Sequence, residues 1–233
     1  MPEFYAPDFS ATQPELPPDE SKHAIRALRL NIGDPVEVVN GRGQRFRCAI
    51  SIPDAKRTVL EIQSTAEESP RSIQFHLAIA PTKNRDRIEW LVEKAVELGV
   101  ERITLLEGDH SERAKVNFDR LKRIMVSAMK QSKRSWIPEL HGLVKTAKFW
   151  SNVQEEEKYI AHCEERDKVP IQSITGKSCV IAIGPEGDFS SSEIELAQSN
   201  GWIGLDLGDM RLRTETAGLL SCSVLALKAM ELR

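Results

Sequence analysis

The stretch AIGPEGDFSSSEI, residues 182–194, leads from a predicted strand into a predicted helix. Just before the turn, CVIAI at 179–183 is a continuous apolar run, which is typical of a strand covered on both faces. Two glycines bracket a proline and a glutamate at 184–187. Such a turn at the carboxyl end of a buried strand lies where ligands bind in open α/β sheets. From these residues alone, a tight turn without a ligand is an equally good interpretation.

The helix that follows the turn has its own start signals. Ser190 and Glu193 have the S-x-x-E spacing of a capping box, and Phe189 and Ile194 stand where a hydrophobic staple packs. We therefore predict that this helix begins near Ser191.

Strand and helix candidates alternate through residues 71–233. One helix is predicted over 88–99 by apolar residues at i, i+3, i+4 and i+7 and by Gly99 as its C-terminal cap. Another is predicted by an apolar stripe between Leu121 and Met129. The strand candidates are 75–80, 102–107, 158–163, 179–184 and 202–208. This alternation predicts an α/β domain with a mostly parallel sheet.

A second glycine-bearing turn lies in LDLGDMRLRTETAGLL, residues 205–220. The helix predicted after it has Lys228 as its only charge over 216–230, so the core or a partner subunit must cover most of its surface. Four functional side chains at 213–216 stand between strand and helix, which indicates a site. The alternative is a surface pair of Arg213 and Glu215 beside a threonine cap.

Residues 1–70 have a different pattern. A short helix is predicted over 17–30, and short strands over 36–39, 44–50 and 58–62. NGRG at 40–43 predicts a hairpin, because Asn and Gly accept positive φ. We therefore predict a small β-barrel domain over 1–70, a polar linker over 64–72 and an α/β domain over 71–233.

Composition excludes several classes of protein. The chain has 233 residues and a net charge of −3, so it is not expected to coat nucleic acid without specificity. No apolar run is long enough for a membrane span, and residues 1–10 lack the features of a signal peptide. The four cysteines and five histidines form no ligand pattern, so we expect no disulfide, no metal, structural histidines and a cytoplasmic location.

Positive charge is nevertheless concentrated locally. Residues 112–134 contain eight Lys or Arg against two acids, and 20–47 contain six against three. A cationic face of this kind attracts phosphate backbones, although a solvated helix face is an equally good interpretation. With the helical stripe facing inward, most of the cationic side chains are expected to point outward: Arg120, Lys122, Arg123, Lys130 and Arg134.

These residues resemble the SPOUT superfamily of methyltransferases and, within it, the RsmE family. The likeness covers nearly the whole chain, and it is most specific in IGPEG at 183–187 together with LGDMRLRTETA at 207–217. It is also carried by HAIRALR at 23–29, by 83–100, and by SER and QSKR at 111–113 and 131–134.

The resemblance implies a PUA-like β-barrel followed by a SPOUT domain with a C-terminal trefoil knot. It implies methylation of N3 of a uridine in 16S rRNA of the small ribosomal subunit, with S-adenosylmethionine as cofactor. It further implies a homodimer whose active site lies at the subunit interface. Other SPOUT activities (on a ribose 2′-hydroxyl or another RNA) and a non-catalytic RNA-binding ribosome-assembly factor remain alternatives.

The resemblance also implies roles for particular residues. Arg213 and Glu215 are the expected catalytic pair, stabilising charge on the uracil and accepting or orienting a proton. Thr214 and Thr216 are expected to cap the last helix and fix its loop. The cofactor-binding residues are expected to be Ala161, His162, Cys163, Ile183, Gly184, Pro185, Glu186, Gly187, Leu207, Gly208, Leu212, Thr214 and Thr216. The RNA-binding residues are expected to be Arg26, Arg29, Arg113, Gln131 and Arg134.

Two positions depart from the family pattern. Asp188 stands where the family often has a second glycine, and Asp tolerates the left-handed region at a cost of about 1 kcal/mol. Met210 stands where the family often has arginine, so Arg211 or Arg213 must replace any contact which that side chain makes with RNA.

Overall fold

The structure is a computed structural model that describes residues 1–71, 73–112, 116–175 and 177–231. It divides into two compact units. The smaller unit comprises Met1–Pro70 and Val126–Ile137, and the larger comprises Arg71–Met125 and Pro138–Arg233. A segment from the middle of the chain therefore belongs with the N-terminal residues, in addition to the domain expected over 1–70.

The smaller unit is built on a four-stranded sheet in the order β1-β2-β3-β4. Its strands are β1 (Glu3–Tyr5), β2 (Pro35–Val39), β3 (Gln44–Ile52) and β4 (Val59–Glu67). Its helical turns are α1 (Pro18–Lys22) and η1 (His23–Ala27). Apolar side chains from all four strands and from η1 form its core. Because β4 continues to Glu67, the first part of the predicted polar linker is in fact strand.

The predicted hairpin at 40–43 is confirmed between β2 and β3, which pair antiparallel. Gly41 and Gly43 have φ of +74° and +89°. At Gly43 a Cβ atom would lie 2.5 Å from the Trp136 ring, so only glycine allows this close approach. The Gly43 N–H also donates to Ser135 O at 2.9 Å. The turn thus anchors the 126–137 segment to this unit.

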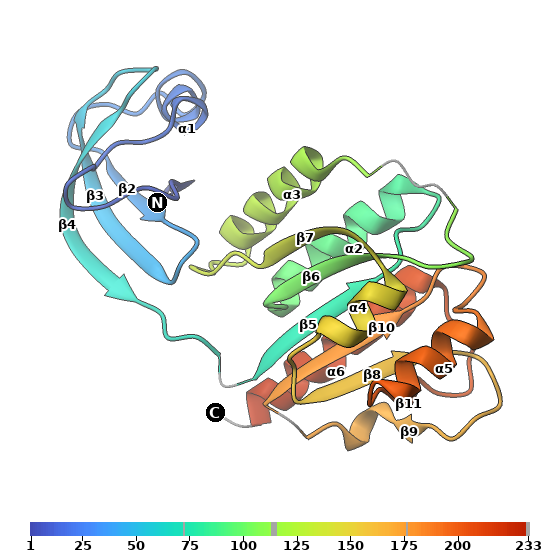
Figure 1. Ribbon diagram of the computed structural model, residues 1–233. Helices are drawn as coiled ribbons and strands as arrows, with labels where there is room; N and C mark the ends of the chain where they lie inside the picture. The colour runs from blue at the N-terminus through green and yellow to red at the C-terminus, as the bar shows by residue number, and fades with distance from the viewer. Residues whose placement is uncertain (72, 113–115, 176, 232–233) are drawn as a thin grey trace. The chain divides into compact units, whose positions relative to one another are not determined.

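The larger unit contains a seven-stranded sheet in the order β7-β6-β5-β10-β8-β11-β9, and every adjacent pair is parallel (Figure 1). The predicted, mostly parallel sheet is confirmed. Its strands are β5 (Gln74–Ile79), β6 (Arg102–Glu107), β7 (Glu139–Lys145), β8 (Glu157–Ala161), β9 (Val169–Pro170), β10 (Ser178–Ile183) and β11 (Ile203–Asp206).

Helices cover both faces of this sheet. On one face, α4 (Thr146–Asn152) and α5 (Ser191–Ser199) bury Trp150 and Ile194 in a core shared with β8 and β10. On the other face lie α2 (Arg85–Leu98) and α6 (Thr214–Glu231), which contact each other. A Cβ on Gly218 of α6 would come within 2.9 Å of Ile79 and Leu91, so the small residue permits this packing.

The start and end signals of the helices are confirmed. Ser190 caps α5 in a complete capping box with Glu193, and Phe189 and Ile194 are both buried in the same core. Gly99 ends α2 with φ of +93°. The remaining helical elements are α3 (Phe118–Gln131) and the short turn η2 (Ile171–Ser173).

Candidate functional site

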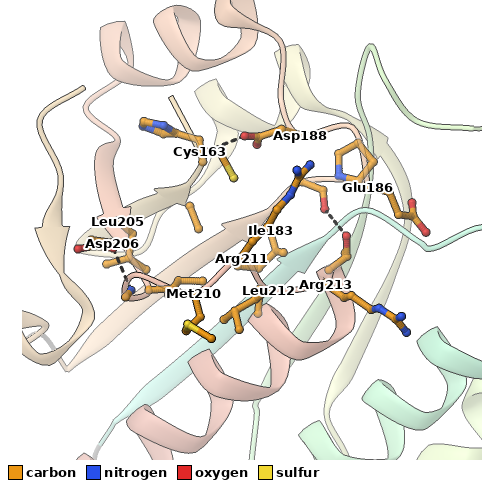
Figure 2. A pocket seen from close by; sticks show the side chains of 18 of the residues that line it. Cys163, Ile183, Glu186, Asp188, Leu205, Asp206, Met210, Arg211, Leu212 and Arg213 are labelled. Atoms are coloured by element: carbon orange, nitrogen blue, oxygen red, sulfur yellow. Dashed lines mark hydrogen bonds between the residues drawn. The ribbon is translucent and has the colours of Figure 1, made fainter. Parts of the chain in front are cut away.

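A cavity of about 740 Å³ opens at the carboxyl ends of β8, β10 and β11 (Figure 2). The strand register explains its position, because Ala161 pairs with both Ile183 and Leu205. The three strands therefore end at one level, and the three turns that follow them surround one space. The lining residues are 161–163, 168, 183–188, 205–214 and 217.

The two glycine-bearing turns predicted as a site meet in this cavity. The hydroxyl of Thr214 is buried and donates to Gly184 O at 3.1 Å, which joins the start of α6 to the end of β10. Thr214 is the first residue of α6, and its hydroxyl thus links the two turns. Twelve lining positions of the cavity coincide with predicted cofactor-binding residues.

The hydrogen bonds of the Asp188 side chain explain how this turn tolerates a residue other than glycine. Its φ is +64°, in the left-handed region. Its carboxylate accepts hydrogen bonds from the backbone N–H groups of Cys163 and Phe189, both at 2.7 Å. The side chain therefore ties the end of β8 to the turn after β10, which glycine in its place could not do.

The turn after β11 carries most of the exposed charges of the site, and Glu186 on the turn after β10 adds another. Gly208, with φ of +103°, donates its N–H to the Asp206 carboxylate at 2.9 Å. Arg211 and Arg213 are both exposed and leave the loop in different directions (Figure 2). Met210 is 79% exposed and contributes an apolar side chain at the rim.

Glu215 and Thr216 do not line the cavity. Glu215 is buried, and its Oε1 lies 3.5 Å from Nε of Arg87 on α2. Its Oε2 has no hydrogen-bond partner among the described residues. Arg87 was not singled out from the sequence, because nothing in a helix pattern shows which residue of a distant loop it will pair with.

Burial affects two titratable groups beside β8. It lowers the pKa of the His162 imidazole, and the nearby Lys168 ammonium acts in the same direction. It raises the pKa of the Cys163 thiol, as does the neighbouring Asp188 carboxylate. Both side chains are therefore uncharged at neutral pH.

The predicted RNA-binding residues are less uniform. Arg26, Arg29 and Gln131 are exposed on the smaller unit, and Arg113 lies outside the described residues. Arg134 is only 8% exposed, so the expectation that it points outward is wrong. The chain leaves the helix before it, through a left-handed Lys133, and turns this residue inward.

Ion pairs reduce the free charge of the basic segment. Arg120 pairs with Glu89 and Lys130 with Glu20, each at 2.6 Å. Lys122 and Arg123 remain exposed beside them on α3. Within the described ranges, no cluster of three potential ligands could hold a metal ion, and no helix is long and apolar enough to cross a membrane.

A parallel α/β unit with a large cavity at the carboxyl ends of its strands is the architecture of an enzyme that binds a nucleotide-like ligand there. A family model described as the RNA methyltransferase domain matches residues 67–226, and one described as the RNA methyltransferase PUA domain matches residues 16–63. The chain therefore belongs to the RNA methyltransferase family with a PUA domain, as the sequence resemblance predicted.

Relatives and solved structures agree with this assignment. The chain is 27% identical to "Ribosomal RNA small subunit methyltransferase E" of Bacillus subtilis over 98% of this chain and 93% of that protein. A crystal structure described as an rRNA-methyltransferase from Porphyromonas gingivalis is 36% identical, with full coverage of both chains and a TM-score of 0.92. A Legionella pneumophila methyltransferase structure with the bound cofactor SAM is 31% identical over 97% of each chain, with a TM-score of 0.82.

Proposed function

We propose that this protein methylates N3 of one uridine in 16S rRNA of the small ribosomal subunit, with S-adenosylmethionine as methyl donor. The observation that carries the proposal is the joining of the turns at 183–188 and 205–214 around one cavity. Family membership and the ribosomal RNA activity named for its relatives support the choice of substrate.

The cavity fits this cofactor by size and chemistry. Its volume of about 740 Å³ is within the range of small-molecule sites. Ile183, Leu205 and Ala217 offer apolar contact to an adenine ring, while the main chain of the turns offers N–H and C=O groups. Exposed charges at Glu186 and Arg211 suit the charged amino-acid end.

The residues of this chain have separate tasks in the reaction. When bound, S-adenosylmethionine supplies an electrophilic methyl group on a sulfonium centre. Arg213, exposed at the rim, stabilises negative charge on the uracil as N3 loses its proton. Thr214 holds the two turns at a fixed separation, which favours an in-line arrangement of donor and acceptor.

Glu215 has an orienting task in this proposal. It is buried, lies off the cavity and pairs with Arg87, so it is poorly placed to take a proton from a base in the cavity. Its pairing instead fixes the first turn of α6, which directly follows Arg213. Arg87 is thus a positioning residue for Arg213.

N3 lies on the pairing edge of uracil, so the target base must be unpaired or turned out of its helix. We assign RNA contact to Arg26, Arg29, Gln131 and Arg113, because the first three are exposed and cationic or polar. Such an enzyme works in the cytoplasm, where ribosomal subunits are assembled.

We further infer a homodimer with the site at its interface. The outer surface of α6 exposes Leu227 by 61% and Met230 by 64%, and Leu219 and Leu220 are half-buried beside them. A second copy would cover this apolar surface. We also propose that residues 207–231 thread through the loop after β8 as a trefoil knot, in keeping with α5 and α6 covering opposite faces.

Calorimetry with S-adenosylmethionine tests the proposal directly. We expect saturable one-site binding to the wild-type protein and a lower affinity in Gly184→Val, whose side chain would crowd Phe189 N, 3.1 Å from the position of a Cβ. No binding at millimolar cofactor would favour a non-catalytic RNA-binding factor. Methyl transfer to a ribose hydroxyl, identified by mass spectrometry, would favour the other activity of the superfamily.

A further inference from the structure

The loop after β6, residues 108–112, contacts the turn after β10 although it does not line the cavity. Its His110 side chain is exposed, and Nδ1 of the ring lies 3.1 Å from both Gly187 O and Asp188 O. Gly187 and Asp188 are themselves lining residues of the cavity. The imidazole therefore reaches the main chain of the cavity turn from outside the cavity.

The two carbonyl groups fix the position of the hydrogen on the His110 ring. A carbonyl oxygen only accepts hydrogen bonds, so Nδ1 carries a hydrogen and shares it between Gly187 O and Asp188 O. In the neutral ring, Nε2 then has no hydrogen. Protonation would add one at Nε2 and leave the Nδ1–H in place, so the contact persists in either charge state.

The loop approaches the turn so closely that a side chain at residue 187 would crowd it. A Cβ on Gly187 would lie 3.2 Å from Cβ of His110, which is tighter than an ordinary van der Waals contact. The φ of Gly187 is not positive, so the conformation of the turn does not itself require glycine. The space left for His110 explains the glycine instead.

Other hydrogen bonds tie the loop to the start of α5. The Asp109 N–H donates to the Glu193 carboxylate at 3.2 Å, and the Asp109 carboxylate accepts from the Ser190 hydroxyl at 2.6 Å. Within the loop, the Gly108 N–H donates to the Ser111 hydroxyl at 2.8 Å. The imidazole is thus carried by a loop that is itself held in place, and its N–H restrains the turn.

We propose that His110 is a positioning residue for the cofactor. Its N–H holds the peptide groups of Gly187 and Asp188 in one orientation, so the main chain of the turn is arranged for the cofactor before it binds. A site arranged in advance binds more tightly, because less conformational freedom is lost on binding. This inference rests on the proposed function, since it takes S-adenosylmethionine as the occupant of the cavity.

Two variants of nearly equal shape test the hydrogen bond. His110→Asn keeps an N–H donor at about the place of Nδ1, and His110→Leu has no donor there. In calorimetry with S-adenosylmethionine, we expect the Kd of His110→Leu to rise about fivefold, the effect of one hydrogen bond, and that of His110→Asn to stay within about twofold of the wild type. His141→Leu, which alters an exposed histidine on β7, is the matched control and should bind as the wild type does.

Urea unfolding of the same proteins separates positioning from a general effect on stability. A residue that only stabilised the fold would lower the free energy of unfolding in His110→Leu without changing the Kd, because nearly all molecules of a stable variant are folded. A raised Kd that His110→Asn restores is therefore specific to the N–H and the turn.

The outcomes distinguish this inference from the proposed function. Equal Kd values for His110→Leu and the wild type would overturn the role of His110 and leave cofactor binding intact. Equal losses in His110→Asn and His110→Leu would show that the N–H is not what the turn requires. If the wild type binds no S-adenosylmethionine, the proposed function and this inference both fall.

A spectroscopic measurement on the wild-type protein needs no variant to fold. The ¹⁵N spectrum of the neutral His110 ring should show the hydrogen on Nδ1 and a bare Nε2. A neutral ring with its hydrogen on Nε2 would contradict the proposal, because Nδ1 could then donate to neither carbonyl group.

Discussion

Replacing Asp188 separates two opposing contributions to stability at the turn after β10: the hydrogen bonds of its carboxylate and the strain of its backbone. Its carboxylate accepts two backbone N–H groups at 2.7 Å, from Cys163 and Phe189. Each bond contributes about 1.5 kcal/mol, the lower end for a charged acceptor, because the side chain is only half-buried. Against this stands its φ of +64°, which costs a residue with a Cβ about 1 kcal/mol relative to glycine.

The two substitutions at Asp188 therefore have different predicted costs. Asp188→Ala loses both hydrogen bonds and keeps the backbone strain, so the free energy of unfolding should fall by about 3 kcal/mol. Asp188→Gly loses the same bonds but relieves the strain, so the fall should be about 2 kcal/mol. The difference between the variants measures the strain, and their common loss measures the tie between β8 and β10.

Urea unfolding followed by tryptophan fluorescence can measure both values. Trp150 lies in the core beside Phe189, with ring centroids 5.5 Å apart, so its emission reports on this region. An alanine variant as stable as the wild type would show that the carboxylate does not tie the strands. Equal stabilities of the alanine and glycine variants would show that the backbone at 188 is not strained.

Three further predictions follow from other contacts. Arg87→Ala should lower the free energy of unfolding by about 1–2 kcal/mol, because it leaves the buried Glu215 carboxylate without its cation. The same variant should reduce the rate of methyl transfer, while its Kd for the cofactor changes less than about twofold. Leu227→Asp should convert a dimer into a monomer in light scattering, because it places a charge on the apolar outer surface of α6. For Glu155, burial opposes ionisation, but the hydrogen bond and charge of His76, a backbone hydrogen bond and the charge of Arg102 together outweigh it and hold the pKa at about 2. The stability that this carboxylate contributes above the ordinary carboxyl pKa is lost as the pH falls toward 2, and Glu155→Gln should flatten that acid limb of the unfolding curve.

Each of these predictions has a control and a contrary result. Arg85→Ala changes an exposed arginine at the start of α2 and should leave both stability and methyl transfer unchanged; similar losses in both variants would count against a specific pairing. Leu196→Asp alters a leucine of α5 that is 40% exposed and should leave the dimer intact. An unchanged acid limb in Glu155→Gln would mean that other carboxylates control acid unfolding.

The strands and helices that position the site were predictable because their signals are local. The apolar run at 179–183 marks β10, and the pattern at Ser190 and Glu193 marks the start of α5. By contrast, β7 (Glu139–Lys145) has no buried residue, and α4 has only seven residues, so neither shows a clear hydrophobic period. Elements of this kind become recognisable only when the rest of the sheet is in place.

The site was predictable as two turns but not as a set of contacts. That the turns meet depends on β8 lying between β10 and β11, and strand order does not follow from hydrophobic pattern. The hydrogen bond from Thr214 to Gly184 O and the pairing of Arg87 with Glu215 link residues far apart in the chain. Arg134 was misplaced for a related reason, because a helical period was extended past the residue where the helix ends.

The most direct test of the central claim is nucleoside mass spectrometry of 16S rRNA from a strain that lacks this protein. The account predicts that 3-methyluridine is lost at one position. It also predicts that methylation returns when the purified wild-type protein and S-adenosylmethionine are added to small subunits from that strain, but not with the Arg213→Ala variant. An unchanged 3-methyluridine content in the deletion strain, or full restoration by Arg213→Ala, would contradict it.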